Sequence, residues 1–399
     1  MPTTPQPTPD AEPSIVLNKF SGLVNTVSRE RLDANELASA INVDVDDRDQ
    51  LHRRRGYTKR LAGNCHSLFA SNDRTVYGVV DGNLCIIRPD YSTVVLKSGL
   101  NSDPSAGLDP LCYQEVGSTI YYSSVTDSGK ITDYTVYPWG AQIDGGTWVS
   151  PVVIPTPTLA PIAGRLLSKP PMATAMTYFN GRLYMACGRQ LWATELYLYD
   201  YVDKTKNFFQ FEADITMVGA VTDGIYVGTD EGLWFLQGPA FPLKRTRIMD
   251  SAVIRGSMVD IPAELANPPQ VPADADTPVK ISICFMTENG YCVAQDSGNA
   301  TNFSEDKFIF PNMVRAAAFY RRQDGMNQYV VVCDSEGAPA HNSRIGEYLD
   351  PAFVRAVDSQ NPALEGMSCS EKWEATLAKL VPESAVMGEE YVATLVPAL

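Results

Sequence analysis

Histidine is scarce in this chain, and its cysteines are not spaced to bind a metal. Among 399 residues there are three histidines, at 52, 66 and 341, and the eight cysteines include no CxxC pair. Structural zinc sites need closely spaced Cys and His ligands, and the HExxH, GxSxG and phosphate-loop motifs are also missing. We therefore expect no enzyme activity, no cofactor and no metal. The scattered cysteines are expected to be reduced and mostly buried.

The sequence also lacks long apolar runs and an excess of basic residues. No run is long enough to span a bilayer, and the start, MPTTPQPTPDAEPS, has neither the basic nor the apolar region of a secretory signal. The formal net charge is −15. Because binding to phosphate backbones depends on clustered Lys and Arg, this charge argues against a general nucleic-acid binder. We expect a product that folds in the cytosol without membrane insertion.

Short strand-like runs separated by Gly, Asp, Asn and Ser clusters fill most of the chain. Each of five units has an apolar or aromatic run, a turn whose Gly or Asn tolerates positive φ, and a second apolar run, which together indicate a β-hairpin. The units begin at Val76, Ile120, Leu183, Ile225 and Phe285. Tyr184 and Tyr226 are 42 positions apart, and Tyr77 and Tyr121 are 44 apart. These spacings suit the four-stranded blades of a propeller, although hairpins alone leave a β-sandwich open.

The predicted fold class is therefore all-β and β-propeller-like, with blades of antiparallel strands, an N-terminal extension and a short C-terminal helix. Residues 1–14 form a flexible Pro/Thr-rich arm, 15–58 an N-terminal assembly segment, and 59–345 the propeller-like body. Proline-rich inserts interrupt the body near 150–172 and 262–278. In the segment 346–399, a capping box at Ser368 and apolar residues at helical spacing predict one amphipathic helix, which we expect to dock on the propeller.

Three local patterns each have a structural and a functional interpretation. The sequence DGGTW at 144–148 is similar to the end of a sialidase Asp-box, but one residue is missing and no second copy exists, which favours a structural turn. The acidic run 44–49 suggests calcium but lacks the Gly and Glu of an EF-hand loop, which favours a solvated strand end. The arginines at 53–55 could sit in a solvated turn, contact phosphate or latch onto an acidic neighbour, and we favour the latch.

The N-terminal segment contains an ordered series of residues. The series comprises Phe20 to Asn25, Arg31, Leu32, Asn35 to Ile41, Asn42 to Asp46, Leu51, Arg53 and Gly56. This order resembles the signature of bacteriophage tail and virion propeller proteins. The usual turn glycine before Leu51 is absent, since Asp49 and Gln50 stand there. The resemblance covers about 40 of the 399 residues and agrees with the independent hairpin repeat.

This resemblance implies a structural virion protein, such as a tail nozzle or head-to-tail ring subunit that forms part of the DNA conduit. Its implied partners are copies of itself in a hexameric ring, portal or adaptor ring proteins, tail fibres and genomic DNA in transient passage. It implies assembly in the host cytoplasm and a final place in the tail or neck of the virion. The expected interface residues are Phe20, Asn25, Arg53, Arg54 and Arg55. The alternatives are a propeller adhesin or glycan-binding module and, less favoured, a carbohydrate-active enzyme with two carboxylates.

Overall fold

The protein is described from a computed structural model, and the description covers part of the chain. It comprises residues 20–40, 43–45, 50–53, 58–100, 110–140, 142–143, 147–148, 167–262, 281–304, 307–310, 313–323, 326–334 and 391–395. Every statement below refers to these residues.

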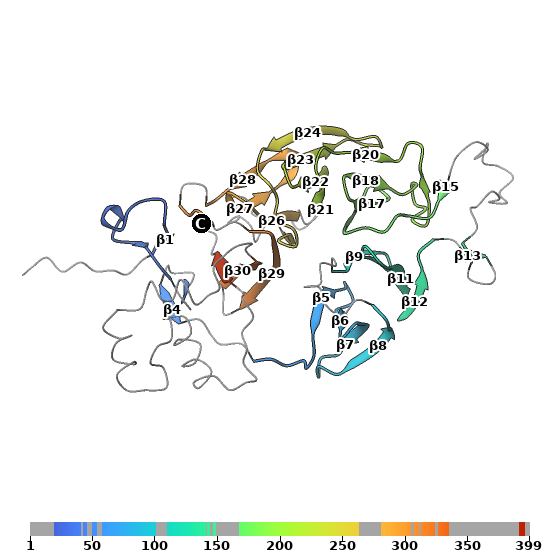
Figure 1. Ribbon diagram of the computed structural model, residues 1–399, viewed down its shortest axis with the longest axis horizontal. Coiled ribbons are helices and arrows are strands. Elements are labelled where there is room, and N and C mark those ends of the chain that lie inside the picture. The colour runs from blue at the N-terminus through green and yellow to red at the C-terminus, as the bar shows by residue number, and fades with distance from the viewer. Residues whose placement is uncertain are drawn as a thin grey trace, which may run out of the picture.

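Six antiparallel sheets, called sheets 1 to 6, follow one another along the described chain and lie around a common centre (Figure 1). Within each sheet the strands are hydrogen-bonded in chain order. Sheet 1 comprises β5 (Cys65–Ala70), β6 (Val76–Val80), β7 (Asn83–Ile87) and β8 (Thr93–Lys97). Sheet 2 comprises β9 (Cys112–Val116), β10 (Thr119–Ser123), β11 (Ser128–Thr132) and β12 (Thr135–Pro138). Sheet 3 comprises β16 (Ala175–Phe179), β17 (Arg182–Cys187), β18 (Gln190–Ala193) and β20 (Phe208–Gln210).

The second half of the body repeats this plan. Sheet 4 comprises β21 (Ile215–Val221), β22 (Gly224–Thr229), β23 (Gly232–Gln237) and β24 (Lys244–Met249). Sheet 5 comprises β25 (Val259–Pro262), β26 (Ile281–Thr287), β27 (Gly290–Ala294) and β28 (Ala300–Asn302). Sheet 6 comprises β29 (Arg315–Gln323), β30 (Met326–Asp334) and β31 (Tyr391–Leu395). The first strands β9, β16 and β21 of consecutive sheets lie side by side. Five of these sheets have four strands and sheet 6 has three among the described residues. Antiparallel sheets of this kind arranged around a centre form a β-propeller, which confirms the predicted fold class.

The packing between sheets explains why the strand sequences are apolar on both faces. Side chains alternate across a strand, so each inner strand sends one set of residues to the preceding sheet and the other to the following sheet. In β22, Ile225 and Val227 pack against sheet 3, whereas Tyr226 packs against sheet 5. Five clusters of this kind join sheets 1 to 6 in series.

The repeated tyrosines occupy one equivalent position. Tyr77, Tyr121, Tyr184 and Tyr226 all lie on the second strand of their sheets, and each packs toward the sheet that follows. The spacing of 42 and 44 residues therefore measures the step from one blade to the next. In sheet 5 the tyrosine that packs toward the next sheet is Tyr291, on the third strand, so the sequence of this unit departs from that of the other four.

All five predicted hairpins are present as antiparallel pairs of second and third strands: β6–β7, β10–β11, β17–β18, β22–β23 and β26–β27. In the first, Val80 pairs with Asn83 across Asp81 and Gly82, whose φ values of 47° and 74° are those of a tight hairpin turn. One turn was misplaced: Ser128 and Gly129 already belong to β11, because the Ser124 hydroxyl and backbone close the turn at residues 124–127.

The N-terminal segment forms two small strand pairs. In the first, β1 (Gly22–Leu23) and β2 (Glu36–Leu37) are parallel, with the 3₁₀ turn η1 (Arg29–Arg31) between them. In the second, β3 (Val43–Val45) and β4 (Leu51–Arg53) are antiparallel. Further short elements are the pair β13 (Gln142–Ile143) and β14 (Thr147–Trp148), the pair β15 (Leu167–Ser168) and β19 (Val202–Asp203), and the 3₁₀ turn η3 (Asp296–Gly298).

Several predicted features fall beyond the described residues. They are the arm at 1–14, nearly all of both proline-rich inserts, and the amphipathic helix expected from Ser368. The structure adds that β31, from the predicted C-terminal segment, pairs with β30 and so forms part of sheet 6. Within the described ranges, no helix has the length and apolar character to cross a membrane.

Candidate functional site

Residues 21–37 form a closed loop, called the N-terminal loop. It contains Asn25, one of the expected interface residues, and directly follows Phe20, another of them. The Ser21 amide donates to the Asn35 carbonyl at 2.8 Å, and the Val24 amide donates to the Leu37 carbonyl at 2.9 Å. Of the loop residues only Val24 is buried, and most positions between 25 and 35 are exposed. The loop therefore has a fixed base and an exposed outer surface.

Asn25 attaches this loop to the connection between sheets 5 and 6. Its side-chain amide donates to the Ile309 carbonyl at 2.9 Å and its side-chain oxygen accepts from the Ile309 amide at 2.6 Å. The Asn25 backbone amide also donates to the Lys307 carbonyl at 2.9 Å. An amide side chain can make both side-chain bonds at once because it is both donor and acceptor. Asn25, expected at an interface between protomers, is thus engaged within its own chain.

Replacing Asn25 with alanine should release the N-terminal loop from the body while the propeller stays folded. The loss of two hydrogen bonds is expected to cost about 1–2 kcal/mol of local docking free energy. Trypsin should then cleave after Arg29 or Arg31 about tenfold faster, with little change in the melting temperature. Asn35→Ala, an equal truncation at an exposed position of the same loop, is the control. Equal cleavage rates in the two variants would show that the hydrogen bonds of the Asn25 side chain to Ile309 do not hold the loop on the body.

The structure does not unite the other expected interface residues with Asn25. Phe20 is half-buried immediately before the loop, whereas Arg53 is exposed at the end of β4, in the other strand pair. Arg54 and Arg55 lie outside the described residues. The acidic run is also only partly described, with Asp44 opposite His52 in the β3–β4 ladder.

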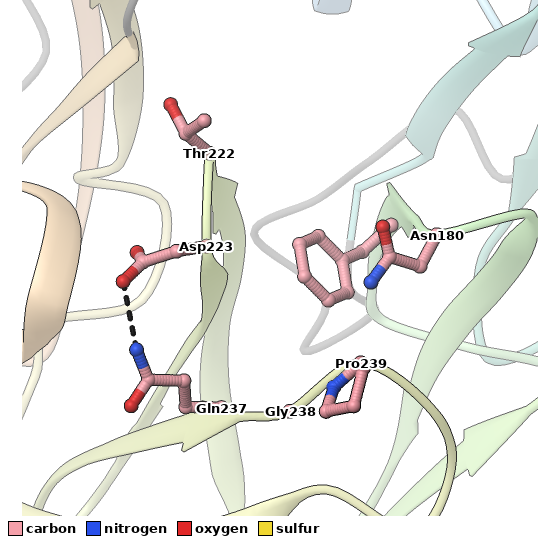
Figure 2. A pocket seen from close by; sticks show the side chains of 7 residues that line it. Asn180, Thr222, Asp223, Gln237, Gly238 and Pro239 are labelled. Carbon is pink, nitrogen blue, oxygen red and sulfur yellow. Dashed lines mark hydrogen bonds between the residues drawn. The ribbon is translucent and has the colours of Figure 1, made fainter.

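A hollow of about 530 Å³ lies between sheets 3 and 4 on the side where first and second strands are joined. It is lined by Phe179, Asn180, Thr222, Asp223, Gln237, Gly238 and Pro239. Figure 2 shows Thr222, Asp223 and Gln237 on one side of this hollow and Asn180 on the other. The lining offers one aromatic face, two amide side chains and a carboxylate, a set suited to recognising hydroxyl-bearing ligands.

Asp223 is largely committed to holding sheet 4 against sheet 5. It accepts a hydrogen bond from the Gln237 amide at 2.8 Å and from the Ser297 backbone amide at 3.0 Å. In return, the Thr222 amide donates to Asp296 at 3.1 Å. This carboxylate therefore positions the wall of the hollow. Asn180 is left to meet a ligand, and so are the groups of the Gln237 side chain that its bond to Asp223 does not use, namely the side-chain oxygen and the second N–H. The sequence marks the turns by Asn180–Gly181 and Asp223–Gly224, but nothing in it indicates that the two turns meet.

The described cysteines form no disulfides with one another. Of these seven residues, Cys85, Cys284, Cys292 and Cys333 are buried, as expected from the sequence, and Cys65, Cys112 and Cys187 are half-buried. Burial raises the pKa of Cys284 and of Cys333 to about 11, so both stay protonated at neutral pH. Among the described residues no group of three or more His, Cys, Asp and Glu side chains is placed to hold a metal ion.

Asp260, on β25, has the largest pKa shift among the described carboxylates. Its side chain is exposed to solvent, yet the protein packed around it desolvates the charge and raises its pKa from 3.8 to about 6. The folded state then binds a proton more tightly than the unfolded chain between about pH 4 and pH 6. Protonated Asp260 therefore adds to the free energy of unfolding. This contribution is complete below pH 4 and is lost as the pH rises through 6.

Asp260→Asn should therefore stabilise the fold at pH 7.5 and have no effect near pH 3.5. The expected gain is about 1 kcal/mol, an amount reduced to allow for the solvent contact of the side chain. Urea unfolding at a series of pH values measures it, with Asp133→Asn at an exposed turn as the control. A gain that did not change with pH would exclude desolvation of the carboxylate as its cause.

No family model matches this chain, and no curated protein matches it. Solved structures with a similar arrangement include BBS1N in complex with ARL6DN, at 10% identity and a TM-score of 0.40, over 73% of this chain and 83% of that one. The WD40 domain of Neurospora crassa Pan2 is similar at 8% identity and a TM-score of 0.35, over 68% of this chain and 76% of that domain.

A bacterial chain is similar over a smaller share of its own length. The extracellular domain of a hybrid two-component system from B. thetaiotaomicron matches at 10% identity and a TM-score of 0.39, over 70% of this chain but 32% of that one. The chain thus spans about a third of that protein's length. With every TM-score below 0.5, these likenesses add nothing to what the chain's own six sheets establish about its fold.

Proposed function

We propose that this chain is a structural subunit of a bacteriophage tail or neck, assembled with copies of itself into a ring around the path of the DNA. The proposal names a tail nozzle or head-to-tail ring subunit, a hexamer, with portal or adaptor proteins and tail fibres as neighbours. It rests mainly on the ordered residues between Phe20 and Gly56, which resemble the signature of virion propeller proteins.

The N-terminal loop supports this proposal. An element that joins subunits needs a firm attachment to its own body and a surface left free for its neighbour. Asn25 and the β1–β2 pair provide the attachment, and Val27, with 43% of its surface exposed, belongs to the free part. The net charge of −15 is compatible with a conduit, because an acidic wall would not retain DNA.

Mass photometry of the purified full chain, alone and with its neighbouring virion proteins, tests the ring. We expect a discrete hexamer in at least one of these conditions. Asn25→Ala should lower the hexamer fraction several-fold, because the released loop must be ordered again on assembly, and Asn35→Ala should lower it much less. A chain that stays monomeric in both conditions, or that hydrolyses a polysaccharide as a monomer, would refute the proposal.

A further inference from the structure

Three tyrosines are exposed at matching places in sheets 1, 2 and 3. Tyr91 is 49% exposed, Tyr134 56% and Tyr197 68%. Each lies in the connection from the third to the fourth strand of its sheet, namely β7 to β8, β11 to β12 and β18 to β20. In antiparallel sheets arranged around one centre, these connections all lie on the same face of the propeller. The three residues, called the tyrosine row, therefore lie on that face in three successive sheets, whose strands are labelled in Figure 1.

All three tyrosines have an unfavourable backbone conformation. Their φ values are 65°, 59° and 57°, in the left-handed region where bulky side chains are rare and glycine is favoured. A turn alone would be better served by Gly or Asn at each place. Strain held at an exposed tyrosine in each of these three connections indicates that the rings serve something other than the turns, since strained residues collect at binding sites.

The charge beside the rings narrows the ligand class. Asp90 precedes Tyr91 and Asp133 precedes Tyr134, and the chain as a whole carries −15, while the exposed Arg88 lies in the same turn as Tyr91. One arginine among these carboxylates does not favour a polyanion such as nucleic acid, whose binding depends on clustered Lys and Arg. A neutral sugar fits better, since its apolar ring face packs on an aromatic ring and its hydroxyls can bond to nearby carboxylates.

The row also ends beside the hollow between sheets 3 and 4. The Tyr197 amide donates to the Gly181 carbonyl at 2.8 Å, and a Cβ at Gly181 would lie 2.8 Å from the Tyr197 ring. Gly181 follows Asn180, which lines the hollow with Gln237. An aromatic ring and two side-chain amides thus lie close to one another.

We infer that this face binds a neutral polysaccharide, with the tyrosine row stacking on successive parts of one chain and Asn180 and Gln237 binding sugar hydroxyls at its end. Rings repeated blade by blade match a polymer of repeated units, and several weak contacts along one polymer multiply into useful affinity. Such a site is independent of the ring assembly proposed above, since it needs only a single copy of the chain.

Affinity electrophoresis of the full chain tests this site, using native gels that contain dextran, mannan or soluble starch. The wild type should be retarded by at least one of the three, and the variant Tyr91→Gly, Tyr134→Gly, Tyr197→Gly should bind that polymer at least tenfold more weakly. Glycine suits the positive φ at each position, so this variant should melt no lower than the wild type. Each single glycine variant should weaken binding by less than the triple.

The matched control replaces the same three tyrosines with phenylalanine, which keeps the rings and should keep most of the retardation. Free migration of the wild type in all three gels would overturn the inference, as would equal retardation of the triple glycine variant. Retardation by heparin alone would also overturn it in favour of a polyanion. A triple glycine variant that lost only its ability to form hexamers would show that the row contacts protein instead.

Discussion

Gly256→Ala should destabilise the protein by more than about 3 kcal/mol, because the substitution combines backbone strain with a collision against main chain. Gly256 has a φ of +80°, and a Cβ at this position would collide with the Ala316 carbonyl oxygen. That oxygen cannot swing aside as a side chain could. The adjoining bond, from the Ala316 amide to the Arg255 carbonyl at 2.7 Å, joins sheet 5 to sheet 6 and would have to open. Guanidinium unfolding measures the loss, and amide exchange should increase first in β29 and β30.

Gly99→Ala provides the matched control for this prediction. Gly99 also has a φ of +80°, but no atom of the described residues lies within 4 Å of its would-be Cβ. The control retains the strain and removes the collision, so its cost should be about 1 kcal/mol. Equal losses in the two variants would show that the contact between Gly256 and Ala316 does not restrict the fold.

Tyr226→Ala should cost about 3–5 kcal/mol, the range found when large buried aromatic side chains are truncated. Tyr226 is fully buried between sheets 4 and 5, and its ring centroid lies 4.7 Å from that of Phe235. Its hydroxyl donates to the carbonyls of Gln295 and Asn299, in the loop that joins β27 to β28. Truncation therefore removes both core volume and a tie between sheets 4 and 5.

Two further variants separate these contributions in the same unfolding experiment. Tyr226→Phe keeps the ring and should lose about 1–2 kcal/mol, the value of the hydroxyl bonds and of the carbonyls left without them. Tyr137→Ala removes the same side chain from an exposed position on β12, where 47% of its surface is accessible, and should cost less than about 1 kcal/mol. A Tyr226→Ala loss as small as that of Tyr137→Ala would contradict the packing described here.

The hairpin pattern could be predicted from the sequence because the information is local. A tight turn needs residues that tolerate positive φ, such as Asp81 and Gly82, and the strands on each side need apolar residues for two buried faces. The spacing of the tyrosines also predicted the length of a blade. Each of the four packs between its own sheet and the sheet that follows: Tyr77, Tyr121, Tyr184 and Tyr226. In sheet 5 the corresponding tyrosine, Tyr291, lies on the third strand, so the spacing of the tyrosines does not extend to this blade.

The contacts of the N-terminal loop could not be predicted in this way. The order of the residues in this segment gives no information on their partners: Asn25 bonds to Ile309, 284 positions away, through that residue's backbone. Every residue offers the same backbone groups, so the sequence has no feature that identifies Ile309 as the partner. The hollow is equally hidden, because Asn180 and Gln237 meet only through the packing of sheet 3 on sheet 4.

The amino-acid sequence by itself determined the hairpins, the blade repeat and the absence of familiar catalytic motifs, since each depends on residues near one another in the chain. Only the tertiary structure decided that six sheets follow one another around a centre, that β31 returns to complete the last sheet, and that three strained tyrosines share one face. These features depend on how separate blades pack. That packing is set by the shape and volume of side chains brought together from distant parts of the chain, which periodicity does not encode.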